Sequence, residues 1–269
     1  MLEKFVRLIQ RVAKNICQEF ECRKYIKMSR HSSLNNAYER IYFYHIRKAA
    51  GTSLNHMFLS SGGEPGGKVY ARLVKAFTRQ TVSNGLVFAG WDKKLIEKGN
   101  YYYAFSHLPF HRVRLPKNTF SFTCLRDPVS RVLSHYKMLE QCRQSLSPPL
   151  WFNKEKMWLG NTFNDFLDKV PKVHLLTQLF MFSKEYDIEE AFDRIMGCTC
   201  FIFTEKFDQG VQLLSSRTGC TLEPIHTRKA SFNFKLEEIE MERLRALLEP
   251  EYQLYNRLKK TSPKTADSV

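Results

Sequence analysis

The stretch that decides the fold is IYFYHIRKAAGTSL, residues 41–54. Each of its first six residues is either aromatic or β-branched, which predicts a buried β-strand. Arg47 and Lys48 follow at once, and three small residues then let a ligand approach the backbone closely. We expect Thr52 or Ser53 to cap the helix that comes next. A strand, a tight turn and a helix N-terminus together predict an anion site, because backbone N–H groups and the positive end of the helix dipole meet there.

The turn differs from the phosphate-binding loop of nucleotide hydrolases. In the Walker A pattern GxxxxGK[ST] the lysine follows the last glycine, whereas Lys48 precedes Gly51 by three residues. That pattern also places a magnesium-binding hydroxyl after the lysine, but the residue after Lys48 is Ala49. A P-loop-like kinase or nucleotide hydrolase is therefore the less favoured alternative. The plain alternative is a strand followed by a capped helix with a surface lysine.

The composition indicates a globular, strongly basic protein. Of the 269 residues, 43% are hydrophobic and 13% aromatic, and the formal net charge is +15. This charge favours polyanionic partners but does not choose between nucleic acid, an anionic membrane and phosphorylated ligands. A basic nucleic-acid-binding protein is thus a second alternative. We expect no nucleic-acid partner, because no motif of the known nucleic-acid-binding folds is present.

The cysteines and the hydropathy pattern bear on the compartment. The seven cysteines are scattered, form no CxxC pair and have no zinc-like spacing, so we interpret them as free thiols in a reducing compartment. Charged residues interrupt the first thirty positions, which argues against a secretory signal. The sequence contains no run of about 18 apolar residues, so we predict no transmembrane helix. We therefore expect a cytoplasmic protein.

The chain divides into three expected segments. Residues 1–30 have the apolar spacing of a basic amphipathic helix, residues 40–260 form one α/β domain, and residues 261–269 form a flexible polar tail. The face formed by residues 1–20 could contact an anionic membrane as a peripheral helix. We favour packing of this helix on its own domain or on a second subunit, which leaves an oligomer open.

Further strands and the helices between them predict the fold. Apolar runs indicate strands at residues 86–89, 101–105, 120–125 and 200–204. We expect a central, mostly parallel sheet with helices on both faces. His107 follows the second of these runs, and chemistry gathers beyond the carboxyl ends of parallel strands. His107 is thus a candidate general base, with a structural histidine as the alternative.

A second polar motif follows the strand at 120–125. Asp127 is a natural N-cap and Pro128 a natural first residue of a helix. Arg126 lies at the end of the strand, and Ser134 lies about two turns along that helix. An arginine and a hydroxyl that converge here predict a second phosphate site.

The two motifs HIRKAAGTSL and FTCLRDPVSRVLSHY resemble the donor-binding motifs of the sulfotransferases that use 3'-phosphoadenosine 5'-phosphosulfate (PAPS). The resemblance is strongest to the branch that includes the carbohydrate 2-O-sulfotransferases. It implies a P-loop-like sulfotransferase fold in which the phosphosulfate is held by Arg47, Lys48, Ala50, Gly51, Thr52 and Ser53. It also assigns the 3'-phosphate to Arg126 and Ser134, the base to His107, and a late donor-binding loop to Arg228 and Lys229.

The same resemblance implies a reaction. A sulfuryl group would pass by in-line displacement to a hydroxyl or amine of a small-molecule acceptor, such as a natural product, or of a glycan. Lys48 would stabilise the leaving oxygen and His107 would take the acceptor proton. We expect no metal, because positioning and positive charge can carry this chemistry. His45, His111 and His135 compete with His107 for the role of base.

Overall fold

The computed structural model describes residues 9, 10, 12, 13, 16, 17, 20, 24, 34, 35, 37–76, 78–225 and 236–261. Most of the segment expected at 1–30 and the tail after Thr261 therefore lie outside the described residues, as do Arg228 and Lys229. The described residues between 9 and 24 are helical, and their large apolar side chains are exposed. In the described ranges, no helix combines the length and the hydropathy that crossing a membrane requires.

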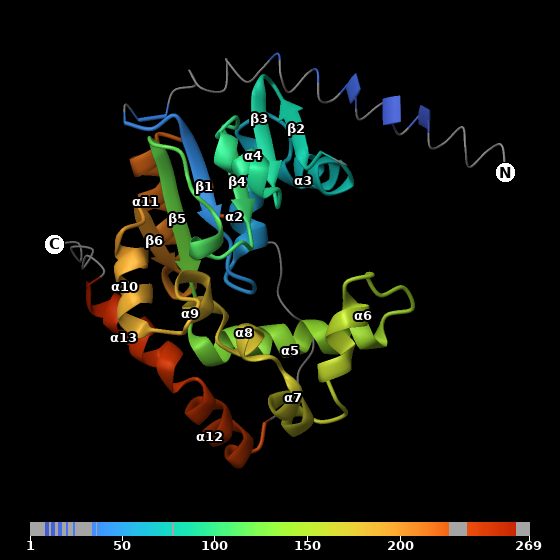
Figure 1. The fold of residues 1–269 in the computed structure, drawn as a ribbon, viewed down its shortest axis with the longest axis vertical. Helices are drawn as coiled ribbons and strands as arrows, with labels where there is room; N and C mark the ends of the chain where they lie inside the picture. The colour runs from blue at the N-terminus through green and yellow to red at the C-terminus, as the bar shows by residue number, and fades with distance from the viewer. Residues whose placement is uncertain are drawn as a thin grey trace.

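A six-stranded sheet forms the centre of the molecule (Figure 1). Its strands are β1 (Arg40–Tyr44), β2 (Gln80–Ser83), β3 (Leu86–Gly90), β4 (Tyr103–Ser106), β5 (Thr119–Leu125) and β6 (Cys200–Phe203). Their order is β2-β3-β4-β1-β5-β6, and every pair of neighbours is parallel except β2 and β3. The expected mostly parallel α/β sheet is confirmed.

The order of the strands gathers the predicted motifs at one edge. β1 lies between β4 and β5, and Tyr44 at its end is opposite Ser106 in β4 and Thr123 in β5. Parallel strands end at the same edge of a sheet, so the turn after β1 is flanked by the residues that follow β4 and β5. These are His107 on one side and Arg126 on the other.

Strand β2 is the one strand of the sheet that the sequence analysis missed. It pairs with β3 as an antiparallel hairpin, Val82 opposite Val87, and Asn84 and Gly85 join the two strands. Both turn residues have positive φ, 47° and 78°, which favours asparagine and glycine. The Asn-Gly pair was the overlooked signal, because this dipeptide between short apolar runs typically indicates a two-residue hairpin.

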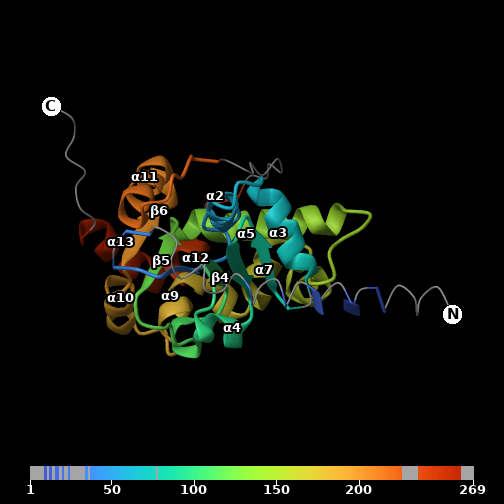
Figure 2. The same ribbon diagram turned by 90° about the horizontal axis from the view of Figure 1, so that it is seen from above.

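Helices cover both faces of the sheet, as Figures 1 and 2 show together. The α-helices are α2 (Gly51–Ser60), α3 (Gly66–Lys75), α4 (Lys93–Lys98), α5 (Pro128–Gln144), α6 (Phe152–Glu155), α7 (Phe163–Lys169), α8 (Lys172–Leu175), α9 (Thr177–Phe182), α10 (Ile188–Met196), α11 (Phe207–Thr218), α12 (Glu238–Leu247) and α13 (Glu249–Thr261). Short 3-10 turns are η1 (Phe110–Arg112), η2 (Lys156–Trp158) and η3 (Thr204–Lys206).

The two faces of β1 belong to two different hydrophobic clusters. Ile41 and Phe43 pack with α2, α3 and α11, whereas Tyr42 and Tyr44 pack with the helices of the opposite face. This division follows from the alternation of side chains along a strand. Because all four side chains are buried, the strand that carries the predicted anion-binding turn is anchored from both sides.

Proline and glycine lie in the first turns of two helices. α13 begins at Glu249, so Pro250 lies in its first turn, where a missing N–H leaves no hydrogen bond unmade. α3 begins with Gly66 and Gly67. A Cβ on Gly66 would lie 1.8 Å from the carbonyl oxygen of His56, so the close approach of α2 to α3 requires glycine here.

Candidate active site

The turn after β1 ends in a helix N-terminus that no side chain caps. Ala50 is the N-cap of α2, with left-handed backbone (φ 53°), and Lys48 is also left-handed (φ 69°). The expectation that Thr52 or Ser53 caps this helix is therefore wrong, because both lie inside its first turn. The side chain of the N-cap residue makes no hydrogen bond to the first backbone amides of α2, so this end of the helix suits an anion.

The ring of His45 packs against this turn at Gly51. The sequence predicted that His45 lies within the strand, but β1 ends at Tyr44 and His45 is the first residue after it. Its ring stacks on Phe43 at 5.2 Å between centroids and is buried under Gly51. Burial lowers the pKa of His45 well below its usual value, so the ring is neutral at pH 7. A Cβ at Gly51 would lie 1.7 Å from Nε2 of His45, which explains the glycine.

Gly51→Ala is expected to lower the free energy of unfolding by about 1–3 kcal/mol, because the new methyl group must displace the buried His45 ring. Gly67→Ala is the matched control, since its Cβ would meet only ordinary contacts, the closest 3.5 Å away at the His56 ring. Within a helix that substitution should stabilise by roughly 0.5–1 kcal/mol. Urea denaturation measures both, and equal stabilities of the two variants would contradict this account of Gly51.

The second motif contacts the first. Arg126 follows β5, and its Nη1 donates a hydrogen bond of 3.1 Å to the carbonyl oxygen of Lys48, 78 residues away in the sequence. The expected start of the next helix is confirmed: the Asp127 side chain accepts from the backbone N–H of Ser130 at 2.8 Å, and a proline begins α5. Ser134 lies half-buried two turns along α5. The two predicted anion-binding motifs thus form one continuous edge.

His107 directly follows β4 and faces a cavity. Its Nδ1 lies 2.7 Å from the carbonyl oxygen of His45. A carbonyl can only accept, so Nδ1 carries the proton and Nε2 carries a lone pair. Although the side chain is open to the cavity, desolvation lowers its pKa below the usual value, and the charge of Arg47 lowers it further against the effect of the His45 hydrogen bond. The ring is therefore neutral at pH 7 and able to accept a proton at Nε2.

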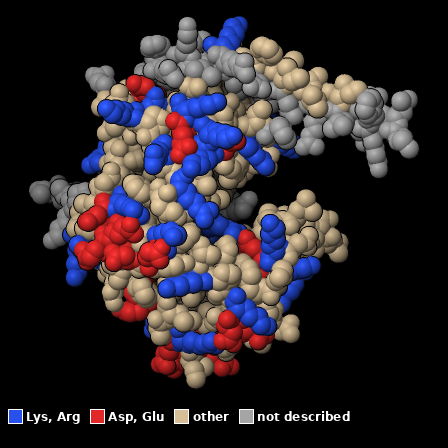
Figure 3. All heavy atoms as spheres, in the orientation of Figure 1, with Lys and Arg blue, Asp and Glu red and all other residues tan. Residues whose placement is uncertain are grey.

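The cavity has a volume of about 590 Å³. Figure 3 shows it as a hollow between the half of the molecule that carries β2 and β3 and the arm that carries α6, with basic side chains along its rim. Its walls combine aromatic, cationic and histidine side chains: His45, Arg47, Tyr70, His107, Leu108, Pro109, Arg112, Trp151, Glu155, Val173, His174, Thr177, Phe180 and Met181. Such a mixture suits a ring-shaped polar ligand.

Of the predicted site residues, the cavity walls include His107, Arg47 and the competing histidine His45. Lys48 and Arg126 meet each other beside it, through the hydrogen bond already described. His111 lies in η1, with its ring 5.7 Å from that of Phe180, and does not belong to the cavity lining.

Glu155 is a site residue that the sequence analysis missed. Its carboxylate binds Arg47 with both oxygens, at 2.5 Å to Nη1 and 3.2 Å to Nη2, and accepts from Nε2 of His135 at 3.1 Å. Burial raises the pKa of Glu155, but the hydrogen bonds from His135 and Arg47 outweigh it and bring the pKa to about 2. Nothing in the local sequence of α6 indicates this role, because both partners lie far away in the chain.

Trp151 is the N-cap residue of α6, in a stretch rich in aromatic residues. It lines the cavity, and 41% of its surface is exposed. The guanidinium carbon of Arg47 lies 5.8 Å from the centre of its ring, within the range of a cation–π contact. Trp151 and Glu155 together hold Arg47 between the anion-binding turn and the cavity.

The burial of His135 predicts a pH-dependent stability. Burial lowers its pKa to about 4 although Glu155 hydrogen-bonds it. The unfolded chain, with a pKa near 6.5, then binds the proton more readily, so stability is lost as the pH falls from about 6.5 to about 4. His135→Gln keeps an N–H donor without titrating, and we expect it to lose on the order of 1–3 kcal/mol less than the unmodified protein over this window. Urea denaturation at several pH values measures the free energy of unfolding of both proteins. If the two free energies fall in parallel with pH, His135 is not the source of the pH dependence.

A comparison with known families identifies the class of protein. A sequence profile described as "Sulfotransferase family" matches residues 31–196, which is 166 of the 269 residues and includes both motifs, His107 and Glu155. The chain therefore belongs to the sulfotransferase family. The match confirms the resemblance inferred from the two motifs, and the carbohydrate 2-O-sulfotransferase branch is consistent with it. A search of curated proteins found no match.

Among the residues that the structure describes, no group of three or more His, Cys, Asp and Glu side chains is arranged to hold a metal ion. The charged groups nearest the cavity are arginines and the Glu155 carboxylate, which Arg47 already engages.

Proposed function

We propose that this sulfotransferase moves the sulfuryl group of PAPS to a hydroxyl of a small-molecule or glycan acceptor. The observation that carries the proposal is the hydrogen bond from Arg126 to the Lys48 carbonyl. It joins two anion-binding strand ends, as a donor with phosphates at both its 5' and 3' positions requires, and this edge lies beside a cavity that contains a neutral histidine.

The donor is assigned to residues on both sides of that hydrogen bond. The uncapped start of α2 and the preceding turn would hold the phosphosulfate through Arg47, Lys48, Ala50, Gly51, Thr52 and Ser53. Arg126 and Ser134 would hold the 3'-phosphate, and Arg228 and Lys229 would add a late loop to the same site. Positive groups of the protein then supply the charge stabilisation that sulfuryl transfer needs.

The acceptor is assigned to the cavity of 590 Å³. Tyr70, Trp151 and Phe180 offer ring faces on which a sugar or another cyclic acceptor can pack, and Arg112 adds a positive charge. Nε2 of His107 would accept the proton of the attacking hydroxyl while Lys48 stabilises the oxygen of the leaving phosphate. An amine acceptor is the alternative, and it would place less demand on the base.

Calorimetric titration tests the donor assignment. The ligand is 3'-phosphoadenosine 5'-phosphate, with 5'-AMP and ATP as controls and a chelator present. We expect tighter binding of the ligand that carries the 3'-phosphate, and about 10–100-fold weaker binding of it by Arg126→Ala, since a charge-assisted hydrogen bond contributes roughly 1.5–3 kcal/mol. Arg217→Ala is the matched control. Arg217, in α11, likewise donates to a backbone carbonyl, that of Thr199, but it belongs to neither of the two motifs.

Two results would overturn the proposal. One is equal affinity for the nucleotides with and without the 3'-phosphate. The other is a clear preference for ATP in the presence of magnesium, which would restore the kinase or nucleotide hydrolase alternative.

A further inference from the structure

The backbone of Arg126 is held by a side chain from another helix. Oε1 of Gln178, in α9, accepts from the backbone N–H of Arg126 at 2.8 Å, and Nε2 of Gln178 donates to the Arg126 carbonyl at 2.9 Å. One amide side chain thus pairs with both backbone groups of Arg126, as a neighbouring strand would. Gln178 is buried, so water does not compete for these bonds.

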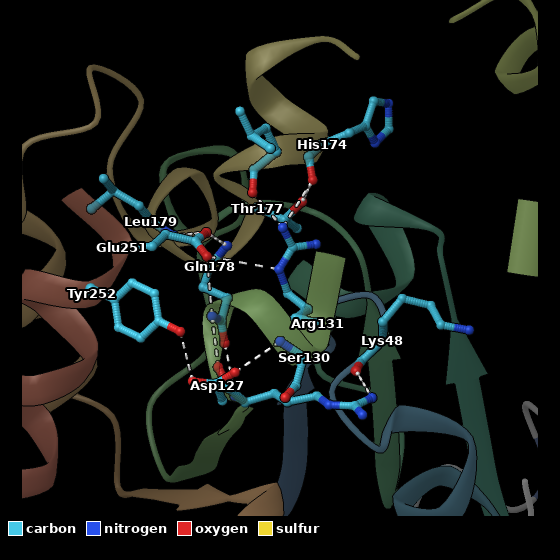
Figure 4. A network of polar contacts seen from close by, with 12 residues as sticks. Lys48, Asp127, Ser130, Arg131, His174, Thr177, Gln178, Leu179, Glu251 and Tyr252 are labelled. Carbon is cyan, nitrogen blue, oxygen red and sulfur yellow. Dashed lines mark hydrogen bonds and ion pairs between the residues drawn. The ribbon is translucent and has the colours of Figure 1, made fainter. Parts of the chain in front are cut away.

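Gln178 is itself fixed by a buried carboxylate. Figure 4 shows Glu251, from α13, beside Gln178 and Leu179. Its Oε1 accepts from the backbone N–H groups of Gln178 at 2.6 Å and of Leu179 at 3.3 Å, and its Oε2 accepts from Nε2 of Gln178 at 3.2 Å. Glu251 is 1% exposed. These contacts fix both the start of α9 and the orientation of the Gln178 amide.

The amide of Gln178 cannot turn over in this environment. A flip would place Oε1 against the Glu251 carboxylate and the Arg126 carbonyl, which are both acceptors, and NH₂ against a backbone N–H. Arg131 supports the arrangement from the other side: it is fully buried, with its Nε 3.7 Å from Oε2 of Glu251, and its Nη2 donates to the His174 carbonyl at 3.1 Å (Figure 4). The backbone groups of Arg126 and the carboxylate of Glu251 therefore fix one orientation of the Gln178 amide.

Arg126 is consequently held at both of its ends. Gln178 holds its backbone, and the carbonyl of Lys48 accepts from its guanidinium. An arginine that must meet a phosphate loses affinity when its side chain has to be ordered at the moment of binding, so prior fixation favours the ligand. Gln178 belongs to neither of the two donor-binding motifs and lies 52 residues after Arg126 in the sequence.

We propose that Gln178 is a positioning residue for the donor: by pairing with the backbone of Arg126, it aims the guanidinium at the 3'-phosphate. This inference rests on the proposed function, in which Arg126 binds that phosphate. Gln178 does not contact the nucleotide in this scheme. Its contribution is therefore confined to ligands that carry the 3'-phosphate, and it disappears when Arg126 is removed.

The test is a double-mutant cycle in calorimetry with 3'-phosphoadenosine 5'-phosphate and 5'-AMP. Gln178→Met keeps the length and removes all three polar contacts of the side chain. We expect about tenfold weaker binding of the 3'-phosphorylated nucleotide, which is the usual effect of losing about one hydrogen bond. The binding of 5'-AMP should not change. In the Arg126→Ala background, Gln178→Met should have no further effect on either ligand.

Ser183→Ala is the matched control. Ser183 is also buried and lies at the other end of α9, where its hydroxyl donates to Glu190 and accepts from the backbone N–H of Asp187. This variant loses two partly buried hydrogen bonds at the end of the same helix without touching Arg126, so we expect both nucleotides to bind as in the unmodified protein. Gln178→Asn, too short to span the same groups, repeats the measurement if the methionine variant does not fold.

The outcomes separate the inference from the function on which it rests. Equal affinity of the unmodified protein for the two nucleotides would overturn both. A preserved preference for the 3'-phosphate in the unmodified protein, combined with equal weakening of both nucleotides by the Gln178 variants, would show a merely structural role. No weakening at all, or an undiminished effect in the Arg126→Ala background, would likewise overturn the positioning role alone.

Discussion

Lys48→Ala is expected to lower kcat by about 10²–10³ while the protein stays folded, since that is the usual cost of losing one electrostatic contact to a developing charge. Lys48 lies in the turn between β1 and α2, at the positive end of the helix dipole. The contact of the turn with Arg126 uses the backbone carbonyl of Lys48, which alanine keeps. The substitution therefore removes the ammonium group without removing the link between the two motifs.

Single-turnover assays with PAPS and a panel of hydroxyl acceptors measure this effect, with nucleotide affinity determined in parallel. Lys154→Ala is the control, because Lys154 is an exposed lysine of α6 near the same cavity. We expect the control to retain most of the activity. A Lys48→Ala variant that turns over at more than a tenth of the unmodified rate would exclude Lys48 as the group that stabilises the leaving oxygen.

The features that the sequence predicted are those encoded by neighbouring residues. The buried strand that ends at Tyr44, the N-cap at Asp127 and the position of His107 after a strand each follow from side chains close together in the chain. The cap of α2 was wrong for a specific reason: Ala50 adopts a left-handed conformation at the N-cap, which residue propensities disfavour. Anion-binding turns can hold such strained residues because the fold around them is rigid.

The cavity, by contrast, could not be predicted from sequence periodicity. Arg47, Trp151 and Glu155 meet there from segments about a hundred residues apart, and Glu155 carries no motif of its own. Tertiary packing alone determines which of many aromatic and charged side chains line a cavity. The two contiguous motifs that we propose to bind the donor were therefore easier to predict than the residues that line the cavity.

The two sites are joined by charges that balance each other. Arg47 lies next to Lys48 in the sequence, yet its guanidinium pairs with Glu155 at the cavity wall. Glu155 in turn holds the neutral ring of His135. The positive charge of Arg47 is thus fixed between the proposed donor turn and the proposed acceptor cavity, where it also helps to keep His107 neutral. Placement of charge at this junction links the proposed donor chemistry to the proposed base.

His107→Gln is expected to lower kcat by about 10²–10⁴, the usual contribution of a general base. The proton of His107 is on Nδ1, bound to the His45 carbonyl, so Nε2 is the atom that accepts a proton from the acceptor hydroxyl. Glutamine keeps an N–H donor in the side chain but cannot act as a base. The neighbouring His111→Ala is the control, because His111 lies outside the cavity lining.

The pH profile distinguishes a base from a residue that only shapes the cavity. A base works in its neutral form, so kcat/KM should fall as the pH drops below the pKa of His107, which desolvation places under its usual value near 6.5. Activity should therefore be flat from pH 7 upward and decline only in acid. His107→Gln should lose this acid limb together with most of the rate. A variant that keeps the limb at a reduced rate would assign it to another group, and one that keeps the full rate would remove His107 from the mechanism.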